Sequence, residues 1–150
     1  MRAVIQRVIE ASVVINQKEF SRIKSGLLVL LGVEENDSNE DLEWLAKKIL
    51  SMRIFGDDDG KMNLALEEAK GDLMIISQFT LYASTKKGNR PSFIKSARPE
   101  LANVMYELFI QFMRSEYIGN IETGVFGEDM KVHLVNDGPV TIIIDSKQRE

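Results

Sequence analysis

The sequence predicts an α/β fold, in which a mixed or antiparallel β-sheet is packed with two main helices. Two observations favour this class: at least six short aliphatic and β-branched runs are separated by turn-forming residues, and two longer segments carry apolar residues at helical spacing. Most connections between these segments are short. With 150 residues and a mass of 17.0 kDa, the chain is expected to be a single domain over residues 1–150.

The first third of the chain is expected to form four strands. Apolar patterning places them at residues 2–9, 12–15, 19–23 and 26–33, with a turn at Asn16-Gln17. The last of these runs is apolar throughout, which is typical of a central strand that is covered on both faces.

The rest of the chain is expected to supply two helices and further strands. Ser38 and Asp41 form the pattern of a capping box, and the spacing that follows predicts a first helix over residues 39–52. Pro99 favours the start of a second helix. Its expected apolar stripe consists of Leu101, Val104, Met105, Leu108, Phe109, Phe112 and Met113. Strands are expected at residues 73–76, 121–126, 130–135 and 140–145.

The composition excludes several kinds of chemistry. Without cysteine, the chain can form no disulfide, no catalytic thiolate and no Cys-ligated zinc site. Its only histidine, His133, falls on the polar side of an alternating strand, so a Ser-His-Asp triad and a zinc cluster have little support. We therefore expect no metal and no cofactor.

The sequence predicts a cytoplasmic protein without membrane contact. Its longest apolar run, residues 27–33, is too short to span a bilayer. Met1-Arg2 leads directly into a strand pattern and not into a signal peptide. A reducing compartment is compatible with the absence of cysteine.

Two polar segments follow strand-like apolar runs and are candidates for a functional site. Ser77, Gln78, Phe79 and Thr80 offer two hydroxyls, a carboxamide and backbone N–H groups, which can orient a carbonyl group and stabilise negative charge on it. In the second segment, residues 136–141, Gly138 lets another molecule approach its backbone and Pro139 fixes φ. A local hydrogen-bonding role for the first segment and a hairpin turn at the second are the alternatives.

Charge argues for a local contact with nucleic acid and against a broad one. The net charge is −4, whereas broad binding depends on many cationic contacts to phosphates. The best candidate for a local contact is the basic loop with Lys86, Lys87 and Arg90, a few residues beyond Thr80. A solvated loop is the alternative.

Taken together, the motifs resemble those of the D-aminoacyl-tRNA deacylases, the D-tyrosyl-tRNA deacylase family. The similar segments occur in the same order from the first residue to about Ser146. They are residues 1–8, 26–33, 53–55, 60–64, 77–81, 90–93, 123–127 and 136–141. Several ungapped motifs in the right order are far more specific than one short signature.

The resemblance implies a compact fold with a strongly curved, barrel-like sheet, and it implies a homodimer. It further implies that Gly138-Pro139 enters the site of the partner subunit as a cis pair, and that Arg7 helps to hold this loop. The implied substrate is the 3′ end of a D-aminoacyl-tRNA, whose ester bond is hydrolysed to free tRNA and D-amino acid. Backbone exclusion of L-amino acids would give chiral proofreading, with leakage onto glycyl-tRNA, including alanine-type tRNA mischarged with glycine.

The catalytic step is expected to need no protein nucleophile. Without an adjacent base, the hydroxyl of Thr80 is a poor nucleophile, whereas the terminal ribose of the tRNA carries its own 2′-OH. A Thr80 acyl-enzyme is the less favoured alternative. Two other functional classes stay open from the residues alone: a module that binds RNA ends without chemistry, and a small dimeric enzyme that acts on another ester or amide.

Overall fold

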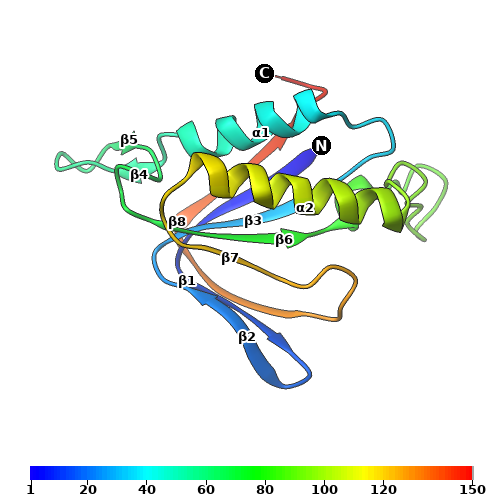
Figure 1. Ribbon diagram of the computed structural model, residues 1–150, viewed down its shortest axis with the longest axis horizontal. Coiled ribbons are helices and arrows are strands. Elements are labelled where there is room, and N and C mark those ends of the chain that lie inside the picture. Colours follow the sequence, from blue (N-terminus) through cyan, green and yellow to red (C-terminus); the bar gives the residue numbers. More distant parts are fainter. Residues whose placement is uncertain (150) are drawn as a thin grey trace.

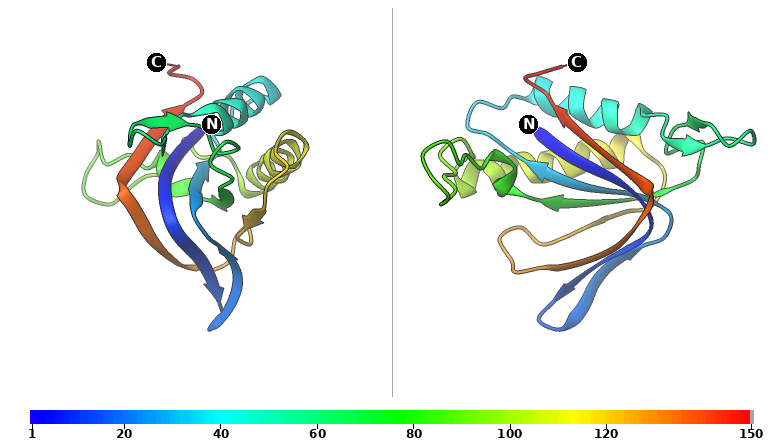
Figure 2. Two further views of the ribbon diagram at one scale, coloured as in Figure 1. Left: turned by 90° about the vertical axis from the view of Figure 1, so that its left-hand side faces the viewer. Right: turned by 180° about the vertical axis from the view of Figure 1, so that it is seen from behind.

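The computed structural model describes residues 1–149, and in them a curved mixed sheet carries two helices on one face (Figures 1 and 2). The strands of the main sheet are β1 (Arg2–Ile15), β2 (Lys18–Ile23), β3 (Gly26–Gly32), β6 (Asp72–Ser77), β7 (Ile121–Thr123) and β8 (Lys131–Asp145). Their order in the sheet is β2-β1-β3-β6-β7, and β8 pairs with β1. The remaining elements are α1 (Asn39–Ser51), the hairpin strands β4 (Phe55–Gly56) and β5 (Met62–Leu64), the 3-10 helix η1 (Phe79–Tyr82) and α2 (Pro99–Glu116).

Curvature of the sheet follows from the length of β1, which pairs with three strands. Its first half pairs with β3, its second half with β2, and β8 runs along both halves. The sheet is therefore nearly closed, as the family resemblance implied. One apolar core lies between the sheet and the two helices, and a second lies inside the curved half. The second core contains Val8, Ala11, Val13, Ile23, Leu28, Met74 and Ile76.

Both helices begin where the sequence predicted, but the buried face of α2 differs. Ser38 caps α1, and the reciprocal hydrogen bonds of a capping box with Asp41 are present. The buried residues of α2 are Ala102, Met105, Tyr106, Phe109, Ile110 and Met113. The predicted stripe was therefore wrong at Val104 and Leu108, which are exposed. Tyr106 belongs to the buried face because its hydroxyl donates a hydrogen bond to the Ile75 carbonyl oxygen, 2.7 Å away.

Two predicted strand breaks are absent. Residues 2–9 and 12–15 form the single strand β1, because residues 10 and 11 both pair with β8. Residues 130–135 and 140–145 fall on one strand as well, and the segment between them is a bulge. Val8 pairs with Asn136 and Gln6 pairs with Thr141. Between these two pairs β8 has four residues and β1 has only one, so the extra residues of β8 bulge out. The predicted strand at residues 121–126 is shorter and ends at Thr123.

Hydrogen bonds from one side chain hold this bulge closed. The carboxamide of Asn136 accepts from the Val140 N–H at 2.8 Å and donates to the Val140 carbonyl oxygen at 3.2 Å. Its Nδ2 also lies 3.2 Å from the Thr141 hydroxyl. A hairpin turn at residues 136–139 is thereby excluded, because the chain continues in the same direction along β1 on both sides of the bulge.

Candidate active site

The first predicted site segment lies at the end of β6, where the chain leaves the sheet. β6 pairs in parallel with β3 as far as Ser77 and with β7 as far as Ile75, so β3 holds its last residue. Beyond Ser77, the N–H of Gln78 donates to the Leu31 carbonyl oxygen at 2.7 Å, and the chain then turns into η1. Gly32 allows this close turn, because a Cβ there would lie 3.1 Å from the Gln78 carbonyl oxygen and 3.2 Å from Leu81 Cβ.

Hydrogen-bond donors remain available at the start of η1. The backbone N–H groups of Phe79 and Thr80 have no acceptor within residues 1–149, and the Gln78 side chain does not cap the helix. The orientation of this turn is fixed from the other side, because the Ser96 hydroxyl donates to the Phe79 carbonyl oxygen at 2.9 Å. Such a pair of free N–H groups can stabilise an oxyanion.

A pocket of about 590 Å³ opens beside these donors. Ser77, Gln78 and Phe79 line one side of it. Ile76 of β6 also lines it, and the rest of the lining comes from α2, from the loop before it, from the segment between β7 and β8 and from the start of β8. These further residues are Phe93, Ser96, Ala97, Pro99, Ala102, Phe126, Gly127, Glu128, Asp129, Met130 and Val132. The sequence did not identify this second group of residues as part of a site, although residues 90–93 and 123–127 were among the segments that carried the family resemblance.

Thr80 is exposed and lies outside the lining of this pocket. Its hydroxyl accepts a hydrogen bond from the Gln78 carboxamide. Histidine and lysine are absent from the lining, and the two carboxylates at its rim, Glu128 and Asp129, are exposed. Asp129 is paired with Lys131 at 2.7 Å. The described residues therefore place no general base against Thr80.

The second predicted segment lies elsewhere in the same chain. Gly138 and Pro139 are exposed at the bulge of β8, and the peptide bond between them is cis. Neither residue lines the pocket beside Ser77. Arg7 holds the bulge: its Nε donates to the Asp137 carbonyl oxygen at 3.1 Å, and its Nη1 donates to the Ile54 carbonyl oxygen at 2.6 Å.

Distance along β3 separates the two segments. Arg7 pairs with Leu27 near the start of β3, whereas Ser77 pairs with Leu31 near its end. Four residues of extended strand span about 13 Å. The neighbouring elements show the same separation. Ile54, which contacts Arg7, precedes the β4–β5 hairpin at one end of the molecule, whereas the loop after η1 lies at the other end (Figure 1). One chain alone thus does not bring the two segments together.

The three predicted basic residues lie on the exposed loop between η1 and α2. Lys86, Lys87 and Arg90 are exposed and lie outside the lining of the pocket. The base of the loop is closed by two backbone hydrogen bonds between Ser84 and Ser92, at 2.8 and 2.9 Å. The loop thus begins directly after η1 and returns to the pocket at Phe93.

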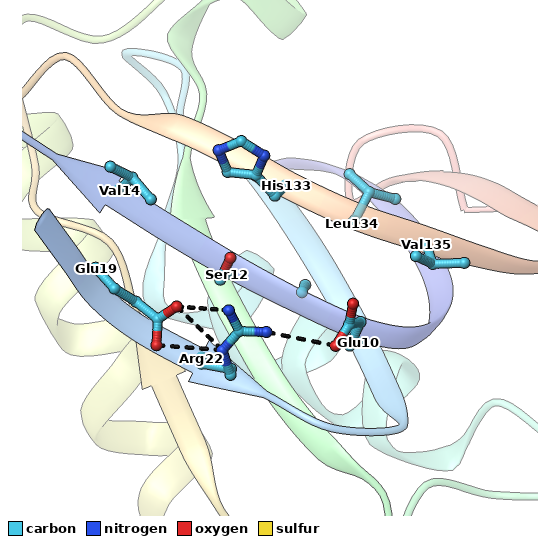
Figure 3. Close-up of a pocket in the computed structure, with 9 residues that line it drawn as sticks. Glu10, Ser12, Val14, Glu19, Arg22, His133, Leu134 and Val135 are labelled. Atoms are coloured by element: carbon cyan, nitrogen blue, oxygen red, sulfur yellow. Dashed lines mark hydrogen bonds and ion pairs between the residues drawn. The ribbon is translucent and has the colours of Figure 1, made fainter. Parts of the chain in front are cut away.

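A separate pocket of about 340 Å³ lies on the face of β8, β1 and β2 that carries His133 (Figure 3). His133 lies beside Ser12, but no hydrogen bond joins them within the described residues. Arg22 is paired with Glu19 at 2.6 Å and with Glu10 at 3.4 Å. The hydrogen bond from Arg22 lowers the pKa of the exposed Glu19 carboxyl. His133 is exposed on this face, and its role as an ordinary residue of the sheet stays a prediction.

Among residues 1–149, no helix combines the length and apolarity needed to cross a membrane. The same part of the chain contains no cluster of three or more histidine, aspartate or glutamate side chains that could hold a metal ion.

Comparison with known proteins identifies the family. The family model described as D-Tyr-tRNA(Tyr) deacylase matches residues 4–145. The chain belongs to the D-Tyr-tRNA(Tyr) deacylase family. Two similar proteins named D-aminoacyl-tRNA deacylase come from Flavobacterium johnsoniae, at 54% identity, and Cytophaga hutchinsonii, at 58% identity; both matches cover the whole of both chains. As a member of this deacylase family, the chain is an ester hydrolase, and the family implies a tRNA substrate.

Solved structures show the same deacylase fold. A structure described as c-Myc DNA Unwinding Element Binding Protein superposes with a TM-score of 0.93 at 39% identity, covering 97% of this chain and 98% of that one. A second, described as a probable eukaryotic D-amino acid tRNA deacylase, has a TM-score of 0.82 at 18% identity and supports the fold alone. It covers 95% of this chain and 97% of the other.

Proposed function

We propose that the pocket beside Ser77, Gln78, Phe79 and Thr80 hydrolyses the ester bond between a D-amino acid and the 3′ end of tRNA, releasing free tRNA and D-amino acid. The observation that carries this proposal is the pair of free N–H groups at Phe79 and Thr80, beside a pocket that is large enough for an aminoacyl group. Donors in this geometry stabilise the oxyanion of acyl transfer, and each contributes about 100-fold to 1,000-fold in rate.

The substrate itself supplies the group that orients or activates the attacking water. Within residues 1–149, the hydroxyl of Thr80 is hydrogen-bonded to the carboxamide of Gln78 and to no titratable side chain. The vicinal 2′-OH of the terminal ribose is held close to the ester by covalent geometry, so it can orient or activate the attacking water. Thr80 then acts through its backbone N–H and forms no acyl intermediate. Neither a metal nor a cofactor takes part.

Chiral proofreading is assigned to backbone exclusion by Gly138-Pro139 of a second copy of the chain. Both residues are exposed and distant from the pocket of their own chain, which supports insertion into the partner's site of a homodimer. Main-chain atoms pressed against the α-carbon would clash with an L side chain, whereas any D side chain would point away. Glycine has no Cβ to be excluded, so glycyl-tRNA, including alanine-type tRNA mischarged with glycine, is also a substrate.

Stereoselective release of the amino acid tests this function. Matched D- and L-tyrosyl-tRNA should differ strongly in hydrolysis, with the L ester spared. D-amino acids of very different size should be hydrolysed at rates within about tenfold of one another, which corresponds to about 1.4 kcal/mol in barrier height. Rates that follow side-chain volume would instead show a conventional side-chain pocket. Equal rates of hydrolysis for the D and L esters would contradict the chiral function.

A second candidate function is binding of nucleic-acid ends without chemistry. The similar structure described as a DNA unwinding element binding protein and the exposed cations Lys86, Lys87 and Arg90 favour it. Under that reading the chain protects aminoacyl esters of both enantiomers and releases neither. A small enzyme that acts on another ester or amide would release the acyl group of model esters without a need for RNA.

The proposed tRNA substrate places the protein in the cytoplasm.

A further inference from the structure

An exposed aromatic pair lies at the mouth of the pocket. The rings of Phe79 and Phe93 meet edge to face with centroids 5.0 Å apart, and the two residues are 56% and 36% exposed. Ile94, the next residue, is 92% exposed. Three large apolar side chains so close together on a surface are unusual unless something covers them.

Cations accompany these apolar residues. Between Phe79 and Pro99 the chain carries Lys86, Lys87, Arg90, Lys95 and Arg98 and no acidic residue, although the whole chain has a net charge of −4. Arg98 is paired with Glu35 at 3.1 Å. The other four make no ion pair within the described residues. An anionic partner with flat apolar groups complements this surface, and a single strand of nucleic acid has both properties.

The backbone around the aromatic pair is firmly held. Ser96 donates to the Phe79 carbonyl oxygen at 2.9 Å, and its own N–H donates to the Phe93 carbonyl oxygen at 2.9 Å. Ser96 therefore ties η1 to the end of the basic loop. A surface that is fixed before binding loses less conformational entropy when a ligand binds.

We propose that Phe79, Phe93 and Ile94 form a platform for the unpaired nucleotide that precedes the terminal adenosine of the tRNA. The base of this nucleotide stacks on the Phe93 ring, and its phosphate lies toward Lys86, Lys87 and Arg90. The inference rests on the proposed function, because an ester held at Phe79 and Thr80 puts the terminal ribose in the pocket and directs the preceding nucleotide out over its aromatic mouth. Stacking on an aromatic ring is tolerant of sequence, which suits an invariant RNA end shared by many tRNAs.

Three substrates with the same D-tyrosyl ester distinguish the contribution of the platform to kcat/KM from that of the pocket. They are D-tyrosyl-adenosine, the D-tyrosyl ester of the trinucleotide CCA, and a D-tyrosyl minihelix that ends in CCA. We expect kcat/KM of the unaltered protein to rise at least tenfold from the adenosine to the trinucleotide ester. Phe93→Ala should reduce this ratio of kcat/KM values about tenfold, and Phe93→Trp should restore it.

Two further variants serve as controls. Ile94→Asp changes a side chain that is almost fully exposed, so it should fold normally while lowering the ratio through lost apolar contact and added negative charge. Phe20→Ala removes a phenylalanine that is 52% exposed on β2 and should leave the ratio unchanged. Replacing Lys86 and Lys87 by serine should reduce the salt dependence of kcat/KM for the minihelix.

Failure of the platform and failure of the proposed function give different results. If the unaltered protein hydrolyses the adenosine and trinucleotide esters equally fast, or if Phe93→Ala and Ile94→Asp leave the ratio intact, the platform is wrong and the deacylase function stands. If the unaltered protein hydrolyses none of the three D-tyrosyl esters, the proposed function itself fails.

Discussion

Arg7 and Asp137 are joined twice across β1 and β8. The Nε of Arg7 lies 3.1 Å from the Asp137 carbonyl oxygen and 3.2 Å from its carboxylate Oδ2. A third contact, from Nη1 to the Ile54 carbonyl oxygen at 2.6 Å, fixes the other side of the guanidinium. The residue immediately before Gly138 is thereby anchored to the middle of the sheet, although Gly138 itself is exposed.

The first prediction concerns this anchor. Arg7→Lys keeps the charge but cannot reach the Asp137 and Ile54 carbonyl oxygens from two directions at once, because lysine lacks the planar fork of arginine. The bulge should loosen, and kcat/KM for D-tyrosyl-tRNA should fall about tenfold while hydrolysis of the L ester rises. Arg22→Lys, which alters an exposed ion pair on β2, is the matched control and should change neither rate. Unchanged stereoselectivity of Arg7→Lys would contradict the anchoring role.

The second prediction concerns the nucleophile. Thr80→Ala retains the backbone N–H at position 80 and should therefore keep kcat within about tenfold of the unaltered protein. A D-aminoacyl-tRNA whose terminal ribose lacks the 2′-OH should lose most of its hydrolysis. Mass spectrometry of the protein during turnover provides the check. An acyl group trapped on Thr80 would contradict the RNA-assisted mechanism.

The third prediction tests how closely β3 and β6 approach. A Cβ at Gly26 would lie 1.9 Å from the backbone carbonyl oxygen of Asp72, so Gly26→Ala forces the two strands apart at the start of their parallel pairing. The free energy of unfolding should decrease by about 3 kcal/mol. Gly56→Ala is the control, since nothing lies within 4 Å of its added Cβ, and it should change stability by no more than about 0.5 kcal/mol. Denaturant titration measures both.

Sequence reasoning located the end of β6 correctly because a buried apolar run that turns polar is a local signal. The remaining lining of the pocket has no such signal. Phe126 and Met130 lie about 50 residues further along, and the pairing of β7 with β6 and of β8 with β1 brings their segment beside Ser77. Their positions depend on topology, which composition and spacing do not determine.

The bulge at residues 136–141 illustrates a second limit. Asparagine, glycine and proline favour turns and bulges alike, so the segment alone does not distinguish them. The pairing with β1 distinguishes a bulge from a turn, because residues of β1 pair with β8 on both sides of the interruption. Tyr106 illustrates a third limit, because its burial depends on the Ile75 carbonyl oxygen that accepts its hydrogen bond. The expected stripe left Tyr106 out, and the buried face of α2 is rotated from that stripe by about one residue.

The fourth prediction concerns acid stability at the start of α1. Burial would raise the pKa of Asp41, but hydrogen bonds from Lys147, Ser38 and Ser146 outweigh burial and hold the pKa well below its usual range. A carboxyl whose pKa is lower in the folded state stabilises the fold above its unfolded pKa of about 3.9 and loses this contribution as the pH falls. Asp41→Asn should therefore lower Tm at pH 7, and the difference from the unaltered protein should shrink as the pH falls from about 4 to 2.

The control for this effect is Asp58→Asn. Asp58 is exposed at the turn between β4 and β5 and makes no ion pair within the described residues, so its variant should follow the unaltered protein at every pH. A constant difference in Tm between Asp41→Asn and the unaltered protein from pH 7 to pH 2 would show that the carboxylate charge of Asp41 is not what stabilises the helix.

The last prediction is that each site is shared between two subunits. Ser77→Trp fills the pocket from one side, and Gly138→Trp removes the glycine needed for backbone exclusion, so each variant should be inactive as a homodimer. Random exchange of subunits makes about half of the dimers mixed, and each mixed dimer regains one intact site by two-fold symmetry. Activity of the mixture should therefore recover to about a quarter of that of the unaltered protein. A site built within one chain predicts no recovery, because every site would then carry one of the two lesions; exchange shown by mass spectrometry without recovered hydrolysis would rule out sharing.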